Sequence, residues 1–225
     1  MPNGSLESLL FQKSPIVLNW KTEYHIAVGT ARGLAYLHHS CRECIIHCDI
    51  KPENILLDGR ICPKIADFGL AKLVSRDFSR IITTMQGTRG YIAPEWISGE
   101  AITAKADVFS YGMLCFEIIS GRRNRDLLDD GLQNYFPTRV AKCINERERD
   151  VDTLLDCRLE GNANKEEVMR ACKVSLLMHS RCENDRRTMG QVDQLSGRSH
   201  RSRHTSYPTV PRPVFKESSR VHTLP

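Results

Sequence analysis

Apolar residues recur at helical spacing in several parts of the chain. A helix is predicted over about residues 20–38, where Asn19 stands at the capping position and apolar side chains follow a period of about 3.6 residues. A second, almost wholly apolar helix is predicted over about residues 105–120, with Gly121 in the position that ends many helices. Shorter helices are expected at about residues 138–145, 150–156, 165–179 and 189–195.

Strand patterns are few and short. Residues 44–46 form an apolar run of strand character, and residues 54–57 and 61–65 flank Asp58-Gly59, which is a strong hairpin signal. Residues 70–92 show little periodicity and are predicted to form a long loop, which is uncommon unless the loop is functional. The whole pattern predicts an α+β fold that is mainly α-helical.

The composition is typical of one soluble domain. A chain of 225 residues can bury one substantial core, and no stretch approaches the roughly 20 consecutive apolar residues that cross a bilayer. Nine cysteines without a repeated spacing fit a reducing, cytosolic setting better than a disulfide framework.

Charge separates a body from a tail. Residues 196–225 hold six basic residues and one acidic residue, whereas residues 1–195 hold 26 of each, so nucleic acid is not an expected partner of the body. The tail is rich in Ser, Arg, His and Pro and lacks apolar periodicity, so we expect it to be disordered. It is either a solvated terminus or an electrostatic contact for acidic partners.

Three motifs follow one another in the middle of the chain. They are H-C-D-I-K-P-E-N at residues 47–54, D-F-G at residues 67–69 and A-P-E at residues 93–95. The first is predicted on a loop before the hairpin, and the second at the hairpin's exit. Each motif alone is weak, but their order and their places on the predicted elements are specific in combination. Together they are similar to the phosphoryl-transfer part of a protein kinase.

Phosphoryl transfer requires positioning and the stabilisation of charge, which gives these residues candidate roles. Asp49 is the candidate catalytic carboxylate that accepts or orients the proton of the attacking hydroxyl, and Lys51 can reach the transferring phosphate. Asn54 and Asp67 supply oxygen ligands suited to Mg²⁺. Gly69 is expected to let the backbone turn sharply after the metal ligand.

Residues 1–195 resemble plant receptor-like serine/threonine kinases, in particular the group with an extracellular G-type (S-locus) lectin. The likeness rests on long segments such as GTARGLAYLHHSCRECIIHCDIKPENILLD and LEGNANKEEVMRACKV. It implies the C-terminal lobe of a protein kinase domain, with a short β-hairpin beside the catalytic loop. It also implies transfer of the ATP γ-phosphate to Ser or Thr hydroxyls, with ATP and Mg²⁺ as cofactors and a protein substrate or another kinase as partner. The location implied is the cytosolic face of the plasma membrane.

The resemblance implies further site residues in three groups. The nucleotide-binding residues would be Met1, Ser5 and Leu56. The activation segment, residues 67–95, would include Phe68, Gly69, the loop hydroxyls of Ser79, Thr83 and Thr84, the acceptor-pocket residues Gly87 and Thr88, and Glu95. The structural supports would be His47, which packs internally, Asp107, which holds the backbone of the catalytic loop, and Arg186, which pairs with Glu95.

Two departures from the family pattern change this picture. Cys48 stands where these kinases often have an arginine that binds a phosphorylated activation loop, so phosphorylation there is not expected to be the main switch. The Gly-rich loop and the lysine that grips ATP find no place before the motifs. We expect an internally assigned start or a piece of a longer gene product, and weak or absent activity in this chain alone.

Two alternatives remain open from the sequence. The first is a zinc site in the Cys/His cluster of residues 38–48, although a second well-spaced pair is lacking. The second is a truncated kinase lobe that acts as a non-catalytic interaction module, binding another kinase or a substrate without turnover.

Overall fold

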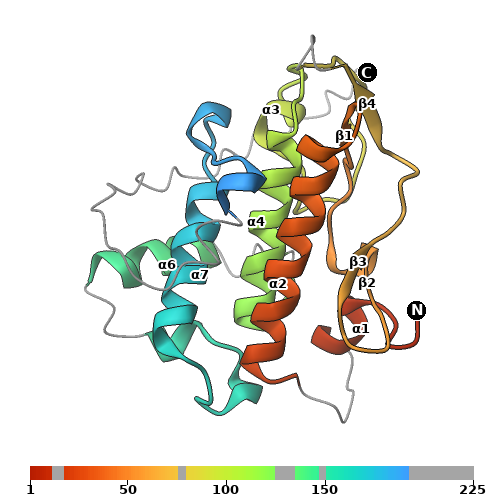
Figure 1. Ribbon diagram of the computed structural model, residues 1–225. Helices are drawn as coiled ribbons and strands as arrows, with labels where there is room; N and C mark the ends of the chain where they lie inside the picture. Colours follow the sequence, from red (N-terminus) through yellow and green to blue (C-terminus); the bar gives the residue numbers. More distant parts are fainter. Residues whose placement is uncertain (12–17, 76–79, 125–134, 147–150, 193–225) are drawn as a thin grey trace, which may run out of the picture.

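The computed structural model describes residues 1–11, 18–75, 80–124, 135–146 and 151–192. Three long helices form its centre, and α4 (Lys105–Ser120) lies between α2 (Trp20–Ala35) and α7 (Lys165–Met178) (Figure 1). Helix α6 (Phe136–Asn145) packs against α7. The short helices α1 (Leu6–Phe11) and α3 (Pro94–Ile97) were not evident from the sequence pattern. The described chain is therefore mainly helical, as predicted.

Helix α4 forms the core of the molecule. Every residue from Ala106 to Ser120 is buried, because an apolar helix without a polar face is stable only in the interior. Gly112 lets α7 approach closely, since a Cβ atom there would lie 3.0 Å from Cβ of Met178. The helix ends at Gly121, whose φ of 63° is left-handed. The predicted range of this helix and its glycine terminus are both confirmed.

Helix α2 begins as predicted, since the Asn19 side chain accepts a hydrogen bond of 2.9 Å from the backbone N–H of Thr22. Its end differs from the prediction. The α-helix stops at Ala35 and continues as a π-helix over Tyr36–Ser40. Within this wider turn His38 is buried, with Nε2 2.9 Å from Oδ2 of Asp107 on α4. A buried imidazole requires a polar partner, and the π-helix brings it to one.

Two small antiparallel sheets lie beside the helices. The predicted hairpin is confirmed as β2 (Ile55–Leu57) and β3 (Pro63–Ile65), with Ile55 opposite Ile65. In its turn the carboxylate of Asp58 accepts the backbone N–H groups of Arg60 and Cys62. The second sheet joins β1 (Cys44–Ile46) to β4 (Lys72–Val74). The prediction of an unbroken loop over residues 70–92 was therefore wrong, because the partner that defines β4 is distant in sequence.

The remaining predicted elements agree with the structure in part. The helices at residues 138–145 and 165–179 are confirmed as α6 and α7, whereas the helix at 150–156 is a 3₁₀ helix, η3 (Val151–Leu154). Further 3₁₀ turns are η2 (Pro52–Asn54), η4 (Cys157–Leu159) and η5 (Glu183–Asp185). Residues 189–192 are helical, while the rest of that predicted helix and the tail at 196–225 lie outside the described residues. In the described part of the chain, no helix combines the length and apolar character needed to span a bilayer.

One acid on α2 is buried without full hydrogen bonding. Glu23 is 1% exposed, and its Oε2 has no hydrogen-bond partner among the described residues. Burial and the negative charge of Asp156 raise the pKa of Glu23 to about 8, although Arg158 opposes the shift. The folded state therefore holds this carboxyl group protonated at neutral pH.

We predict that Glu23→Gln stabilises the protein at neutral pH. In the wild type the folded state binds a proton that the unfolded chain releases above its ordinary pKa of 4.5, so stability falls as pH rises toward 8. Glutamine keeps the neutral shape, and the variant should gain about 1–3 kcal/mol near pH 7. Urea unfolding across this pH range measures the effect, with Glu43→Gln as an exposed control. Parallel stability curves for wild type and variant would refute the assignment.

Candidate active site

Three predicted site residues, Lys51 and Asn54 from the first motif and Thr88 from the resemblance, meet around the carboxylate of Asp49. Asp49 Oδ2 lies 2.7 Å from Nζ of Lys51, and Oδ1 accepts a hydrogen bond of 2.7 Å from the hydroxyl of Thr88. Lys51 also donates to that hydroxyl at 2.8 Å. The amide nitrogen of Asn54 donates to the backbone carbonyl and to Oδ2 of Asp49, at 2.9 and 3.1 Å. A carboxylate, a cation, a hydroxyl and an amide thus form one closed network.

This network determines the charge state of Asp49. Burial alone would raise its pKa, but hydrogen bonds from Lys51 and Thr88, the positive charge of Lys51 and the Asn54 amide together lower the pKa below its usual value. Asp49 is therefore ionised at neutral pH. An ionised carboxylate can accept a hydrogen bond from a hydroxyl group, and Thr88 shows that a hydroxyl fits beside it.

A second carboxylate holds the backbone of residues 47–54, which we name the catalytic loop after their predicted role. Asp107 is fully buried in the first turn of α4 and accepts the backbone N–H groups of His47 at 2.7 Å and Cys48 at 2.9 Å. The same carboxylate lies 2.9 Å from Nε2 of His38. The loop that carries Asp49 is thus bound directly to the central helix.

His47 fixes the loop from its other side. Its Nδ1 accepts the backbone N–H of Asp49 at 3.2 Å, so Nε2 is the protonated nitrogen that donates to the carbonyl of Ala66 at 2.9 Å. The imidazole therefore links the catalytic loop to the residue that precedes the D-F-G motif. Asp107 and His47 thus both contact the backbone of this loop.

Cys48, which lies between His47 and Asp49 in the chain, is buried and has a left-handed φ of 70°. Burial and the negative charge of Asp107 raise the pKa of its thiol to about 12. The side chain is therefore a neutral thiol, and it carries no charge with which to bind a phosphate.

The D-F-G residues lie beside this loop. The backbone N–H of Ala66 donates to the Asn54 carbonyl at 2.9 Å, which holds the start of the segment to the catalytic loop. Asp67 is exposed, and the Phe68 ring packs 5.0 Å from the His47 ring. The backbone turns at Gly69, where the N–H of Ala71 donates to the Phe68 carbonyl at 3.1 Å, and the left-handed φ of 63° belongs to the preceding Asp67. The glycine also makes room, since a Cβ atom there would lie 3.2 Å from Asp67 Oδ1.

The donor set of Asn54 and Asp67 fits Mg²⁺. The amide nitrogen of Asn54 is engaged by Asp49, which leaves its oxygen as the atom for a cation. The Asp67 carboxylate is exposed and accepts a long hydrogen bond of 3.3 Å from the N–H of Gly69. One amide oxygen and one carboxylate, completed by phosphate oxygens and water, are ordinary ligands for this ion.

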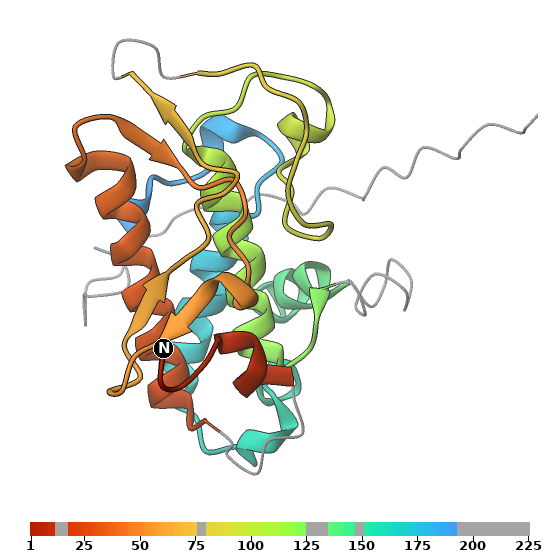
Figure 2. The same cartoon turned by 90° about the vertical axis from the view of Figure 1, so that its right-hand side faces the viewer.

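The predicted nucleotide-binding residues lie at the other end of the hairpin. Ser5 pairs with Leu56 in an isolated antiparallel bridge, so the N-terminal segment runs against β2 (Figure 2). The N–H of Leu57 donates to the Gly4 carbonyl at 2.9 Å. Met1 is 62% exposed at the start of this segment. The structure thus brings Ser5 and Leu56 together and leaves the Met1 side chain open to solvent.

The activation segment approaches the catalytic loop at a glycine. Gly87 has a φ of 111°, and a Cβ atom there would lie 3.0 Å from the backbone oxygen of Cys48. Only glycine allows this approach, which brings the neighbouring Thr88 to Asp49. Thr83 is half-buried and Thr84 is exposed, whereas Ser79 lies outside the described residues.

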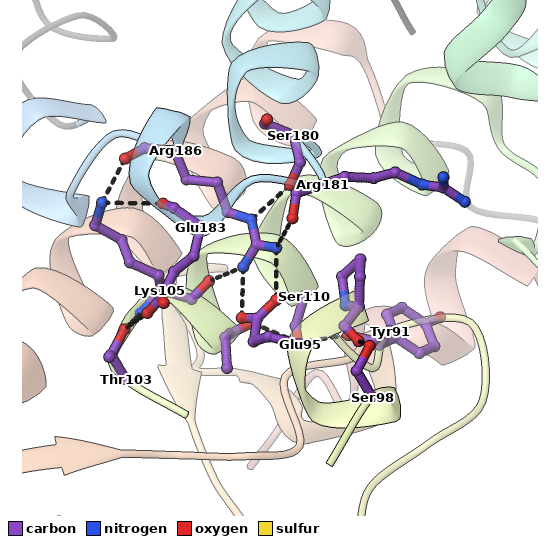
Figure 3. Close-up of polar contacts among 12 residues, drawn as sticks. Tyr91, Glu95, Ser98, Thr103, Lys105, Ser110, Ser180, Arg181, Glu183 and Arg186 are labelled. Carbon is purple, nitrogen blue, oxygen red and sulfur yellow. Dashed lines mark hydrogen bonds and ion pairs between the residues drawn. The ribbon is translucent and has the colours of Figure 1, made fainter. Parts of the chain in front are cut away.

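The A-P-E glutamate and Arg186 form a buried bidentate ion pair. The two guanidinium nitrogens of Arg186 each lie 2.7 Å from an oxygen of Glu95, and both side chains are buried (Figure 3). The same guanidinium donates to the carbonyls of Ser180 and Lys105, at 2.7 and 3.0 Å. Because every donor has a partner, the pair ties the end of the activation segment to the segment that follows α7.

One buried network near the site was not predicted. The Tyr91 hydroxyl donates to Glu117 on α4 at 2.6 Å, and the other oxygen of Glu117 accepts the N–H of Asn124 at 2.7 Å. Burial raises the pKa of Glu117 to about 7, although these two hydrogen bonds oppose the shift. The N–H of Tyr91 donates to the Thr88 carbonyl at 3.1 Å, so the network supports the turn that carries Thr88. An acid within the apolar part of a helix is the sequence signal that could have revealed it.

A second unpredicted contact centres on Arg123, which follows α4. Its guanidinium binds Glu53 of the catalytic loop at 2.8 Å and also Glu7 of α1. It lies 4.5 Å from the centre of the Phe11 ring. This contact joins three segments that are distant in sequence, and no local pattern indicates it.

The zinc alternative finds no support in the described residues. Within the ranges that the structure describes, no three His, Cys, Asp or Glu side chains converge as metal ligands. None of the nine cysteines forms a disulfide.

Comparison with known proteins identifies the class. Residues 1–155 match the protein kinase domain family. Because the match spans more than half of the chain, the chain belongs to this family. Its relatives include three G-type lectin S-receptor-like serine/threonine-protein kinases of Arabidopsis thaliana, which are 60%, 52% and 47% identical over 87% of this chain. The resemblance to plant receptor-like serine/threonine kinases is therefore confirmed. The chain spans about a quarter of the length of these relatives, with 24%, 25% and 22% covered.

We predict that removing Arg186 destabilises the fold strongly. Arg186→Met leaves the Glu95 carboxylate buried without its partner, which typically costs about 3–5 kcal/mol. Chemical unfolding measures the loss, with Arg60→Met as the exposed control. The double variant Arg186→Met/Glu95→Leu should be more stable than Arg186→Met. A loss below about 1 kcal/mol in the single variant would mean that the pair contributes little.

Proposed function

We propose that residues 1–195 form the C-terminal lobe of a serine/threonine protein kinase domain that transfers the ATP γ-phosphate to Ser or Thr hydroxyls of a protein. The observation that carries this proposal is the closed network of Lys51, Thr88 and Asn54 around the ionised Asp49. We further propose that the domain acts in receptor-like signalling at the cytosolic face of the plasma membrane, and that residues 196–225 form a separate basic tail.

Each site residue has a separate role in the proposed phosphoryl transfer. Asp49 orients the acceptor hydroxyl and accepts its proton as the new bond forms. Lys51, which is 2.7 Å from Asp49, offers its positive charge to the transferring phosphoryl group. Asn54 and Asp67 hold Mg²⁺, and bound Mg²⁺–ATP supplies the γ-phosphoryl group. Thr88 and Gly87 shape the pocket for the acceptor residue, while Ser5, Leu56 and Met1 form the adenine side of the site.

A second candidate function is a non-catalytic interaction module. It is favoured by large apolar side chains that are exposed on the activation segment and α3, namely Ile82 (83% exposed), Met85 (56%) and Ile97 (64%). Large apolar side chains that are exposed to solvent, as on these two segments, are typical of a protein contact. Such a module would bind another kinase or a substrate without turnover, and Asp49 would be dispensable for it.

The test compares wild type and Asp49→Asn polypeptides, purified by antibody from plant tissue that expresses each of them as a transgene. The assay follows transfer of labelled γ-phosphate to a protein substrate with Mg²⁺ present or chelated. Transfer that needs both Mg²⁺ and Asp49 supports the kinase proposal. Protein binding that is equal in both polypeptides, with no transfer in either, supports the interaction module instead.

We predict that, in the complete enzyme, Asp49→Asn lowers kcat far more than it changes the KM for ATP. The Asp49 contact strengthens mainly in the transition state, so kcat should fall by about 10²-fold or more while the KM for ATP changes by less than about threefold. Asp152→Asn is the matched control, since Asp152 is exposed and distant from the motifs. If the Asp49→Asn variant retained most of its turnover, the proposed role of Asp49 as the catalytic carboxylate would be refuted.

We predict that a phosphate mimic on the activation segment has little effect. Because Cys48 is a neutral buried thiol, it offers no cation to an acidic side chain at residue 84. Thr84→Glu should leave kcat/KM within about twofold of wild type. A strong activation in the same transfer assay would show that another cationic side chain binds the carboxylate introduced at residue 84.

A further inference from the structure

The activation segment requires an anchor that Cys48 cannot provide. In many kinases a phosphate on this segment binds an arginine and orders the segment. Here the equivalent position is a buried neutral thiol. The structure nevertheless places Gly87 against the Cys48 carbonyl and Thr88 beside Asp49. Some other contact must therefore hold the segment.

A pair of backbone hydrogen bonds supplies part of that anchor. The N–H of Ile81 donates to the Ile102 carbonyl at 3.0 Å, and the N–H of Ile102 donates back at 2.9 Å. Ile102 is fully buried in the loop that leads into α4. The part of the activation segment that begins at residue 80 is thus paired with the approach to the central helix.

Side chains on both sides of this pair bind one carboxylate. Arg80 precedes Ile81, and its guanidinium lies 3.2 Å from Oε2 of Glu183 on η5. Thr103 follows Ile102, and its hydroxyl donates to Oε1 of the same Glu183 (Figure 3). The two carboxylate oxygens of Glu183 therefore bind the residues next to Ile81 and Ile102, one on each side of the backbone pair.

Glu183 is itself held in place. Its side chain is 14% exposed. Nζ of Lys105 donates to its backbone carbonyl at 3.5 Å and to the Arg186 carbonyl at 2.5 Å (Figure 3). Arg186 in turn is fixed by Glu95. The carboxylate is therefore presented from a rigid support rather than from a free surface side chain.

We propose that Glu183 is a positioning residue that holds the activation segment in its working place without a phosphate, by binding Arg80 and Thr103 on either side of the Ile81–Ile102 pair. The fixed carboxylate replaces the added phosphate as the anionic group of the anchor. Its effect on turnover rests on the proposed kinase function, but its effect on the order of the segment does not.

The anchor consists of several contacts, so the experiment must compare the loss of Glu183 with the loss of Arg80 alone. The Arg80 side chain is 56% exposed, so its ion pair alone is weak and sensitive to salt. The hydrogen bond from the Thr103 hydroxyl to Glu183 strengthens the anchor. We expect both contacts of Glu183 to stabilise the backbone hydrogen bonds between Ile81 and Ile102. Loss of Glu183 should therefore release the segment more than loss of Arg80.

The first experiment measures hydrogen exchange of the Ile81 and Ile102 amides in the full chain after phosphatase treatment. Glu183→Ala should speed both exchange rates by about tenfold or more and Arg80→Ala by less, with the Leu57 amide in the hairpin unchanged. Unchanged Ile81 and Ile102 exchange in Glu183→Ala would overturn the proposal. Loss of their protection in the phosphatase-treated wild type would overturn it as well.

The second experiment exchanges the charges. Arg80→Glu should lower kcat/KM for the protein substrate by about threefold to tenfold at unchanged KM for ATP, because only the acceptor side is displaced. The double variant Arg80→Glu/Glu183→Arg should recover activity and amide protection, while the control Lys142→Glu on α6 changes neither. A double variant no better than its parents would contradict the anchor. Absence of transfer in every form, with the exchange results as expected, would refute the kinase function and retain the anchor.

Discussion

The arrangement of the site depends on the carboxylate of Asp107. It is fully buried, yet it is satisfied, because two backbone N–H groups of the catalytic loop and the imidazole of His38 converge on it. A buried polar group of this kind is stable only when it is hydrogen-bonded. The loop that carries Asp49 is therefore held in one conformation by the cost of leaving this carboxylate without partners.

The helix that carries Asp107 organises both halves of the site. Its first turn holds the catalytic loop, and Glu117 near its end supports Tyr91 and so the turn of Thr88. The approach to the helix, at Ile102, pairs with Ile81 of the activation segment. Because α4 is buried along its length, these polar groups are set in a rigid interior and position Asp49 and Thr88 against each other.

Local patterns predicted much of this structure, and distant contacts account for what they missed. The hairpin follows from Asp58-Gly59, and the range of α4 from its apolar run, since both signals lie within the elements themselves. The strand β4 could not be found, because three residues become a strand only through pairing with β1. The motifs indicated the residues around Asp49, but the contact of Glu183 with Arg80 joins segments that no sequence spacing relates.

The central claim is that Asn54 and Asp67 form one cation and phosphate site next to Asp49. Paramagnetic broadening of amide resonances by Mn²⁺–ATP tests it most directly, because broadening reports distance from the bound ion and detects weak binding. The account predicts that the amides of residues 54 and 67–69 broaden first, and that Asp67→Asn abolishes the effect while Asp152→Asn does not. Broadening centred elsewhere on the chain, or unchanged in Asp67→Asn, would contradict the account.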